Sequence, residues 1–177
     1  MENESQSSLI QRITTFLEKE GFSLQFAMLP ESSFLPGIDI QQGVLQIDPA
    51  RLLSPGDILH EAGHLAILTP AERSEANGVV GNDGGMEMAA IAWSWAAAVH
   101  LGIPPSVLFH PNGYKGGSSA LIENFVAGRY IGVPMLEWFG MAAGEKRARE
   151  MGTAAYPAML RWLRAAEGGG EAIDGLS

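Results

Sequence analysis

The stretch Ser54-Pro55-Gly56-Asp57-Ile58-Leu59-His60-Glu61-Ala62-Gly63-His64-Leu65-Ala66 holds the most informative pattern of the chain. Its apolar residues recur at helical spacing, and Thr69-Pro70 supplies a stop, so we expect one amphipathic helix here. Ser54 fits the N-cap, Pro55 the first helical position, and Asp57 the positive end of the helix dipole.

The two histidines of this helix predict a metal site. His60 and His64 are four residues apart, so their imidazoles lie on one helix face, roughly 6 Å apart along the axis, and can reach one ion. Glu61, directly after the first histidine, is placed to contact a water molecule on the metal and act as a general base. The expected ion is Zn²⁺. The alternative is a core helix with two hydrogen-bonded histidines and a solvated glutamate.

The composition indicates one globular domain. The chain has 177 residues, of which 46% are apolar and 18% charged. We expect the domain over residues 1–167 and a flexible tail over 168–177. A net charge of −9 argues against binding nucleic acid or an anionic membrane surface, and the absence of cysteine excludes disulfides and thiolate ligands. The acidic N-terminus does not resemble a signal peptide, so we expect a cytoplasmic protein.

The remaining pattern predicts an α+β fold with a small N-terminal antiparallel sheet followed by packed helices. A hairpin with a turn near Gln42-Gly43 is expected to precede the motif helix, which is the helix that carries His60 and His64. Thr69 is expected to cap the next helix, with Glu72 completing a capping box. The expected strands are 22–29 and the two arms of a hairpin over 38–48, and the expected helices are 8–20, 70–77, 86–101, 118–127, 134–141 and 156–165.

A catalytic zinc ion usually takes a third protein ligand, and Glu87 is the best candidate. It lies near the start of an otherwise apolar helix, where a buried carboxylate needs a cation or a full set of hydrogen-bond donors. The alternative is that Glu87 favours the helix dipole or completes a cap at Gly84. Glu75 is the second candidate, although it lies in a short polar segment. His100 is explained by the end of its helix.

With Glu87 on the next long helix, His60-Glu61-x-x-His64 resembles the gluzincin metallopeptidases, and the compact layout is most similar to the small ImmA/IrrE-type members. The resemblance covers residues 38–101. It implies a zincin-like fold, a zinc ion held by His60, His64 and Glu87, and hydrolysis of a peptide bond with Glu61 as base. The chain departs from the thermolysin pattern at Ile91, where that group carries an aspartate behind a histidine ligand.

The resemblance also implies a group that stabilises the oxyanion, and His110 or Tyr114 in a glycine-rich loop could supply it. By analogy with zincins, the strand over 44–47 would be an edge strand that binds the substrate backbone. The expected partner is a peptide or protein substrate. The sequence does not give the oligomeric state of the protein. Two other functions stay open: a zinc-binding regulatory or partner-binding module without turnover, and a metal-free structural domain.

Overall fold

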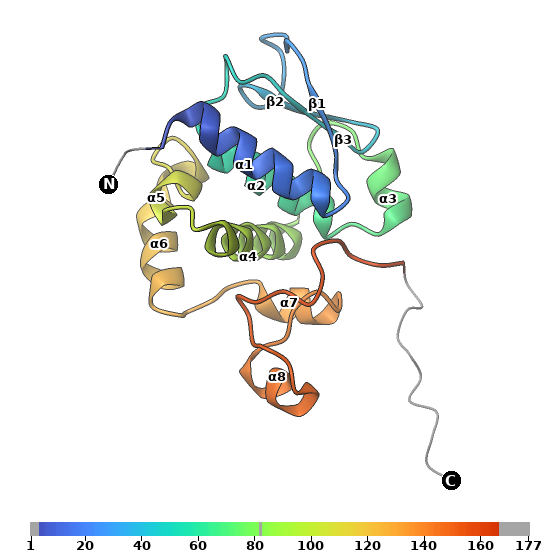
Figure 1. Ribbon diagram of the computed structural model, residues 1–177, viewed down its shortest axis with the longest axis vertical. Helices are drawn as coiled ribbons and strands as arrows, with labels where there is room; N and C mark the ends of the chain where they lie inside the picture. Colours follow the sequence, from blue (N-terminus) through green and yellow to red (C-terminus); the bar gives the residue numbers. More distant parts are fainter. Residues whose placement is uncertain (1–3, 82, 167–177) are drawn as a thin grey trace.

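The computed structural model describes residues 4–81 and 83–166, in which a small sheet lies at one end and helices fill the rest (Figure 1). Helices α1 (Gln6–Lys19) and α2 (Gly56–Ala66) lie beneath the sheet, and α4 (Gly84–Leu101) lies beneath them. Helices α7 (Val133–Trp138) and α8 (Glu145–Met151) are farthest from the sheet. The architecture is α+β. The tail expected over 168–177 is outside the described residues.

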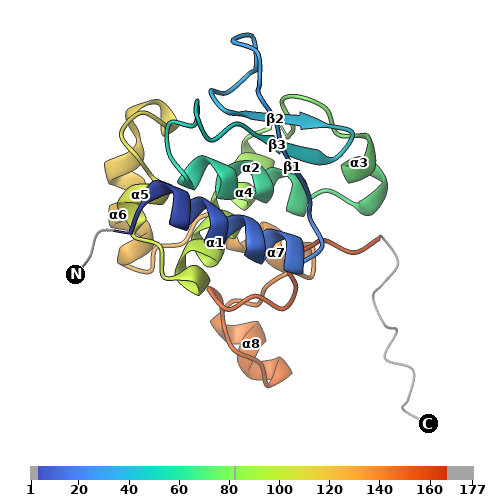
Figure 2. The same ribbon diagram turned by 45° about the horizontal axis from the view of Figure 1, so that its top comes forward.

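The sheet has three strands in the order β1-β3-β2 (Figure 2). Strands β2 (Ile38–Gln41) and β3 (Val44–Ile47) form the expected hairpin, with Ile40 opposite Leu45. Strand β1 (Ser23–Phe26) pairs with β3 in parallel. The sheet is therefore mixed, and the expectation of a wholly antiparallel sheet was wrong. A parallel neighbour needs a crossover, which the stretch between β1 and β3 provides.

The position of β3 also corrects the expectation that residues 44–47 form an edge strand. Both sides of β3 are paired, so this strand cannot accept a substrate backbone. On the outer side of β2, the N–H of Gly78 donates to the carbonyl of Ile40 at 2.8 Å. The edge nearest α3 (Pro70–Glu75) is therefore partly occupied by the chain itself.

The motif helix begins one residue later than expected. Pro55 is the N-cap of α2, and Ser54 stands before it, where its Oγ accepts the N–H of Gly56 at 3.3 Å. The capping box after this helix is confirmed: Thr69 Oγ1 accepts the N–H of Glu72, and the Glu72 carboxylate accepts the N–H of Thr69.

Helix α4 is the centre of the core. Residues 89–98 of this helix are buried, which explains why it carries so few polar side chains. Its contact with α2 is close because Gly63 has no side chain: a Cβ there would lie 2.7 Å from the carbonyl oxygen of Ala90. This contact sets how side chains of α4 reach the histidine face of α2.

The second half of the chain covers α4 with short helices. Helices α5 (Pro105–Leu108) and α6 (Ser118–Val126) are joined by a loop that contains the 3₁₀ turn η1 (Tyr114–Gly116). The helix expected over 156–165 was wrong, because this segment forms turns that pack on α4 and α1. The indole N–H of Trp93 donates to the carbonyl of Trp162 at 2.9 Å, and the hydroxyl of Tyr156 donates to the carbonyl of Ala92 at 2.8 Å. The backbone N–H of Tyr156 donates to the carbonyl of Ala143, and that of Leu160 to the carbonyl of Met141, so tertiary bonds stand where helical ones were expected.

Within the described residues, none of the helices has both the length and the apolar character needed to cross a lipid bilayer.

Candidate metal centre

Helix α2 carries a group of three side chains that could hold a metal ion: His60, Glu61 and His64. The helical spacing places the two imidazoles on one face, and their Nε2 atoms lie 3.2 Å apart. Glu61 and His64 are almost completely buried, with 4% and 6% of their surfaces exposed. The local part of the predicted site is therefore present in the fold.

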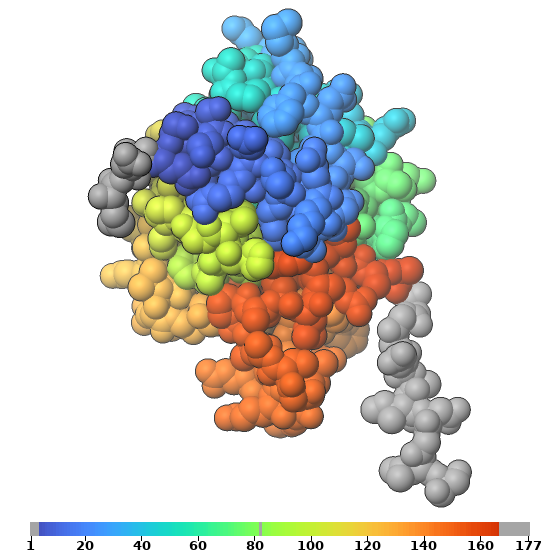
Figure 3. Space-filling model, in the orientation of Figure 1, coloured from blue at the N-terminus to red at the C-terminus, as the bar shows by residue number. Residues whose placement is uncertain are grey.

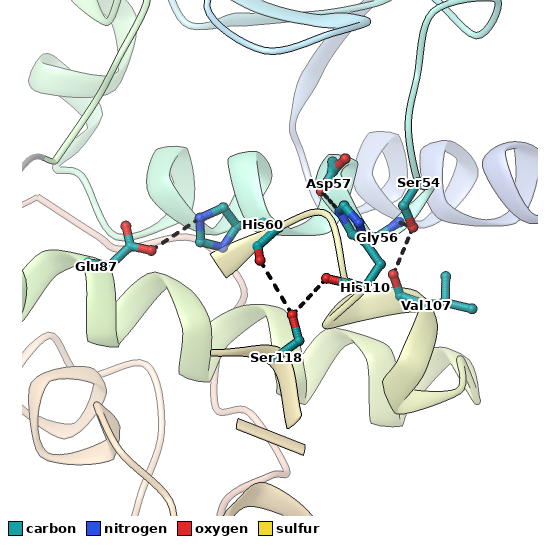
Figure 4. Close-up of polar contacts among 9 residues, drawn as sticks. Ser54, Gly56, Asp57, His60, Glu87, Val107, His110 and Ser118 are labelled. Atoms are coloured by element: carbon teal, nitrogen blue, oxygen red, sulfur yellow. Dashed lines mark hydrogen bonds and ion pairs between the residues drawn. The ribbon is translucent and has the colours of Figure 1, made fainter. Parts of the chain in front are cut away.

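Glu87 of α4 points across the helix interface at His60 (Figure 4), and its carboxylate also contacts His64. Its Oε1 lies 3.4 Å from Nε2 of His60, and its Oε2 lies 3.1 Å from Nε2 of His64. The N-cap of α4 is Asp83, whose Oδ1 accepts the N–H groups of Gly85 and Met86. A capping role for Glu87 with a cap at Gly84 was therefore wrong.

The distances among the three side chains fit a small metal ion. A tetrahedral zinc ion with ligand bonds of about 2.0–2.1 Å separates its ligand atoms by about 3.3 Å. The separations at the interface are 3.2 Å between the nitrogens and 3.1 and 3.4 Å from nitrogen to carboxylate oxygen. Two imidazoles and one carboxylate also form a ligand set that zinc prefers, and they leave a fourth position open.

Burial shifts the pKa values at this site. Burial lowers the pKa of His60 to about 4, with a smaller lowering from His64 and an opposing effect from Glu87. The His60 imidazole is therefore neutral at pH 7, as a metal ligand must be. Burial also raises the pKa of Glu61 to about 7, partly opposed by His64. The hydrogen bond with His64 lowers the pKa of Glu87, so its carboxylate is ionised.

The histidines open onto a cavity of about 800 Å³, large enough for several residues of a peptide. Its walls come from segments far apart in the sequence. Apolar side chains from the loop before β2, the loop before α4 and helix α6 form much of the lining: Phe34, Leu35, Val79, Val80, Ala120 and Leu121. His60, Glu61, His64 and Glu87 lie at one wall.

The two loop residues expected near the oxyanion, Tyr114 and His110, lie in different surroundings. Tyr114 lines the cavity, and its ring contacts that of His60 edge-on at a centroid distance of 5.2 Å. Its hydroxyl is buried and has no hydrogen-bond partner among the described residues, and burial raises its pKa. His110 does not line the cavity, and its Nε2 contacts Oδ1 of Asp57 at 2.6 Å. Only Tyr114 is placed to face a substrate.

The other ligand candidates lie elsewhere. Glu75 is exposed at the end of α3, and it is absent from the residues that line the cavity. His100 is in the last turn of α4, where its ring contacts Phe16 and Trp162. Neither Glu75 nor His100 therefore lies beside His60 and His64.

Sequence reasoning missed two groups near the site. Asp57 was assigned only to the helix dipole, although it stands one turn before Glu61 on the same helix face and could have been recognised from that spacing. Lys115 lines the cavity and lowers the pKa of Glu87 slightly.

The Nδ1 atoms of His60 and His64 are buried and have no hydrogen-bond partner in the described parts of the chain. The orienting group that usually stands behind such ligands is thus not seen.

Comparison with models of protein families, with characterised proteins and with solved structures gives no match. The likeness to gluzincins therefore rests on His60, Glu61, His64 and Glu87 and on their arrangement.

Proposed function

We propose that the protein is a zinc-dependent peptidase with a zincin-like fold. The observation that supports this most is the set of ligand-like distances of 3.1 to 3.4 Å among His60, His64 and Glu87 in the wall of a large cavity. Glu61, which adjoins this set, supplies a carboxyl group whose pKa is near neutral.

His60, His64 and Glu87 would hold the zinc ion. A bound Zn²⁺ supplies Lewis acidity, which polarises a carbonyl group and brings the pKa of water from about 15.7 to about 7. Glu61 accepts the proton of the attacking water and returns it to the leaving amine. A pKa near the working pH suits both transfers, because neither protonation state is then strongly favoured.

Tyr114 is the proposed donor to the oxyanion. Its hydroxyl is buried at the cavity wall without a partner, so it can donate to a substrate oxygen without first breaking a bond within the described chain. The raised pKa keeps the hydroxyl protonated at neutral pH, which a donor requires.

The test is hydrolysis of a peptide library by the zinc-loaded protein and by Glu61→Gln. We expect Glu61→Gln to keep its zinc and to lose about 10²- to 10⁴-fold in turnover, as is typical when a general base is removed. Glu75→Gln is a matched control because Glu75 is exposed and outside the cavity, and it should retain full activity. Undiminished hydrolysis by zinc-loaded Glu61→Gln would contradict the proposal.

One observation favours the second candidate, a zinc-binding module without turnover. The Nδ1 atoms of both histidines lack a partner among the described residues, whereas catalytic histidine ligands usually donate to a carboxylate or carbonyl. Tight zinc binding without cleavage of any peptide in the library, together with a stable protein partner in pull-down experiments, would support this module.

A further inference from the structure

The loop between α5 and α6 contains an unusual run of backbone conformations. Tyr114, Lys115 and Gly116 all have positive φ, at 56°, 50° and 82°. A residue with a Cβ adopts this left-handed region only at an energetic cost, and two such residues in succession are rare. Conformations of this kind persist where the surrounding structure holds them, and they occur at functional sites. The contacts around the loop should therefore show what holds it.

A buried side-chain contact fastens this loop to α2. Nε2 of His110, which is 7% exposed, lies 2.6 Å from Oδ1 of Asp57 in the first turn of α2 (Figure 4). The carbonyl of His110 accepts the hydroxyl of Ser118 at 2.7 Å and the N–H of Gly113 at 3.1 Å. The same hydroxyl also reaches the carbonyl of Gly113 at 3.4 Å. The Ser118 hydroxyl thus binds the loop, and Gly117 occupies the N-cap of α6.

The backbone of the loop packs directly on the His110 ring. A Cβ on Gly113 would lie 3.2 Å from Nε2 of His110, the atom that contacts Asp57, so a larger residue would press on this contact. Tyr114 follows immediately. The position of His110 therefore determines where the chain enters the left-handed turn and where the Tyr114 side chain leaves it.

Tyr114 is set between two rings. Its centroid lies 5.2 Å from that of Phe109 and 5.2 Å from that of His60, both edge-on. Phe109 is the neighbour of His110 in sequence, and His60 lies three residues after Asp57 on α2. The contact of His110 with Asp57 thus joins the loop to α2 beside the ring contact of Tyr114 with His60.

We propose that Asp57 and His110 are positioning residues that fix the Tyr114 side chain over His60. Their contact anchors residues 110–117 to the first turn of α2 and stabilises the strained turn. The link to turnover rests on the proposed function, because only there does the Tyr114 hydroxyl donate to a substrate. The position of the ring is a property of the chain itself and can be measured without metal or substrate.

The first test is ¹⁹F NMR of metal-free protein labelled with 3-fluorotyrosine. The chain has three tyrosines, Tyr114, Tyr130 and Tyr156, and Tyr114→Phe identifies the first signal by its loss. We expect His110→Ala and Asp57→Ala to shift or broaden the Tyr114 signal and to leave the other two unchanged. Asp57→Asn keeps an acceptor oxygen for His110 and should restore a signal close to that of the native protein. An unchanged Tyr114 signal in both alanine variants would overturn the proposal.

Asp48→Ala is the matched control for a general loss of structure. Asp48 is also a buried aspartate, 6% exposed, its carboxylate accepts the N–H groups of Leu29 and Ala50, and it does not line the cavity. This variant should leave the Tyr114 signal in place. If it moved that signal as much as Asp57→Ala does, the effect would be general and the proposal would be wrong.

The second test uses the zinc-loaded protein. His110→Ala should bind zinc as the native protein does, since no ligand is removed, and should lose roughly 100-fold in kcat with little change in KM. It should add no loss to Tyr114→Phe, because both changes remove the same hydroxyl from its place. A further loss in the double variant would overturn the link to Tyr114. A moved NMR signal without any hydrolysis by the native protein would refute the peptidase alone.

Discussion

The carboxyl group of Glu61 is almost completely buried, and its ionisation should make the stability of the metal-free protein depend on pH. Burial raises its folded-state pKa from 4.5 to about 7. The unfolded chain therefore ionises first as the pH rises, and stability is lost between about pH 4.5 and pH 7. The loss by pH 8 is up to about 3 kcal/mol, since each pKa unit corresponds to about 1.4 kcal/mol.

The variant Glu61→Gln removes this titration, so it should gain stability relative to the native protein as the pH rises. Urea unfolding in the presence of a chelator at pH 4.5 and pH 8 measures both proteins. We expect the difference in free energy of unfolding to move by about 2–3 kcal/mol in favour of the glutamine variant. A difference that does not depend on pH would show that Glu61 ionises normally.

Glu87 and Glu75 offer a direct comparison of two carboxylates that the sequence left as alternatives. Glu87→Ala removes the group that contacts both imidazoles and should weaken zinc binding by more than roughly 100-fold, the upper effect of removing a partner behind a ligand. Glu75→Ala should bind zinc normally, because its side chain is exposed. Competition titration with a chromophoric chelator measures both. Equal affinities in the two variants would exclude Glu87 as a ligand.

At the residue scale, the sequence predicted what helical spacing determines. His60, Glu61 and His64 come together because they share one turn of α2. Glu87 was chosen by the argument that a carboxylate buried in an apolar helix needs a cation, but the premise of burial was wrong, because the Glu87 side chain is 44% exposed. His110 could not be placed, because a loop has no period from which its direction can be read. Its partner Asp57 was missed because the helix dipole already explained an acid in the first turn.

At the element scale, the contact between α2 and α4 determines whether Glu87 can reach the histidines. Gly63→Ala would place a methyl group 2.7 Å from the carbonyl oxygen of Ala90, so the helices must separate. We expect a loss of about 1–3 kcal/mol in unfolding free energy and weaker zinc binding. Thermal unfolding and zinc titration test both effects.

Gly84→Ala is the control for this change. A Cβ at Gly84 meets no atom of the described residues within 4 Å, and Gly84 lies in the first turn of α4 with an ordinary helical backbone. Alanine there should leave stability unchanged or raise it by up to about 1 kcal/mol, since it lowers the entropy of the unfolded chain. If both alanine variants behaved alike, the close approach of α2 and α4 would not matter.

The predicted elements were most accurate where a local signal marks their ends. Thr69 with Glu72 fixed the start of α3, and the turn at Gln42-Gly43 fixed the hairpin. The parallel pairing of β1 with β3 depends on residues about 20 positions apart in the sequence, which no local pattern encodes. The segment 156–165 was misjudged for a related reason, since its backbone N–H groups donate to residues distant in the sequence, namely Ala143, Met141 and Ala66.

At the scale of the whole molecule, the last described residues close the core against the first helix. Figure 3 shows the C-terminal segment lying against α1, with the end of α4 beside it. The ring of Trp162 contacts Phe16 of α1 and Trp93 of α4, with centroids 5.0 and 5.5 Å away. At the end of α2, the N–H of Arg164 donates to the carbonyl of Ala66 at 2.9 Å. The C-terminal segment thus contacts α1, α2 and α4.

Trp162→Ala should therefore destabilise the whole protein. It removes aromatic contacts to two distant elements, and we expect a loss of about 2–4 kcal/mol, somewhat below that of a fully buried tryptophan. Trp138→Ala is the control, because Trp138 is 82% exposed, and its effect should be within about 0.5 kcal/mol. Urea unfolding followed by circular dichroism measures both. Similar losses in the two variants would show that the contacts of Trp162 with α1 and α4 do not stabilise the protein.

His60, His64 and Glu87 are proposed to bind a zinc ion, and elemental analysis of the untagged protein measures this binding. The protein is purified without chelator, and His64→Ala is prepared in parallel. We predict about one zinc ion per native chain and its loss from the variant. Native protein that holds no metal after incubation with zinc and removal of the excess would contradict the claim, and the histidine pair would then be part of a metal-free helix.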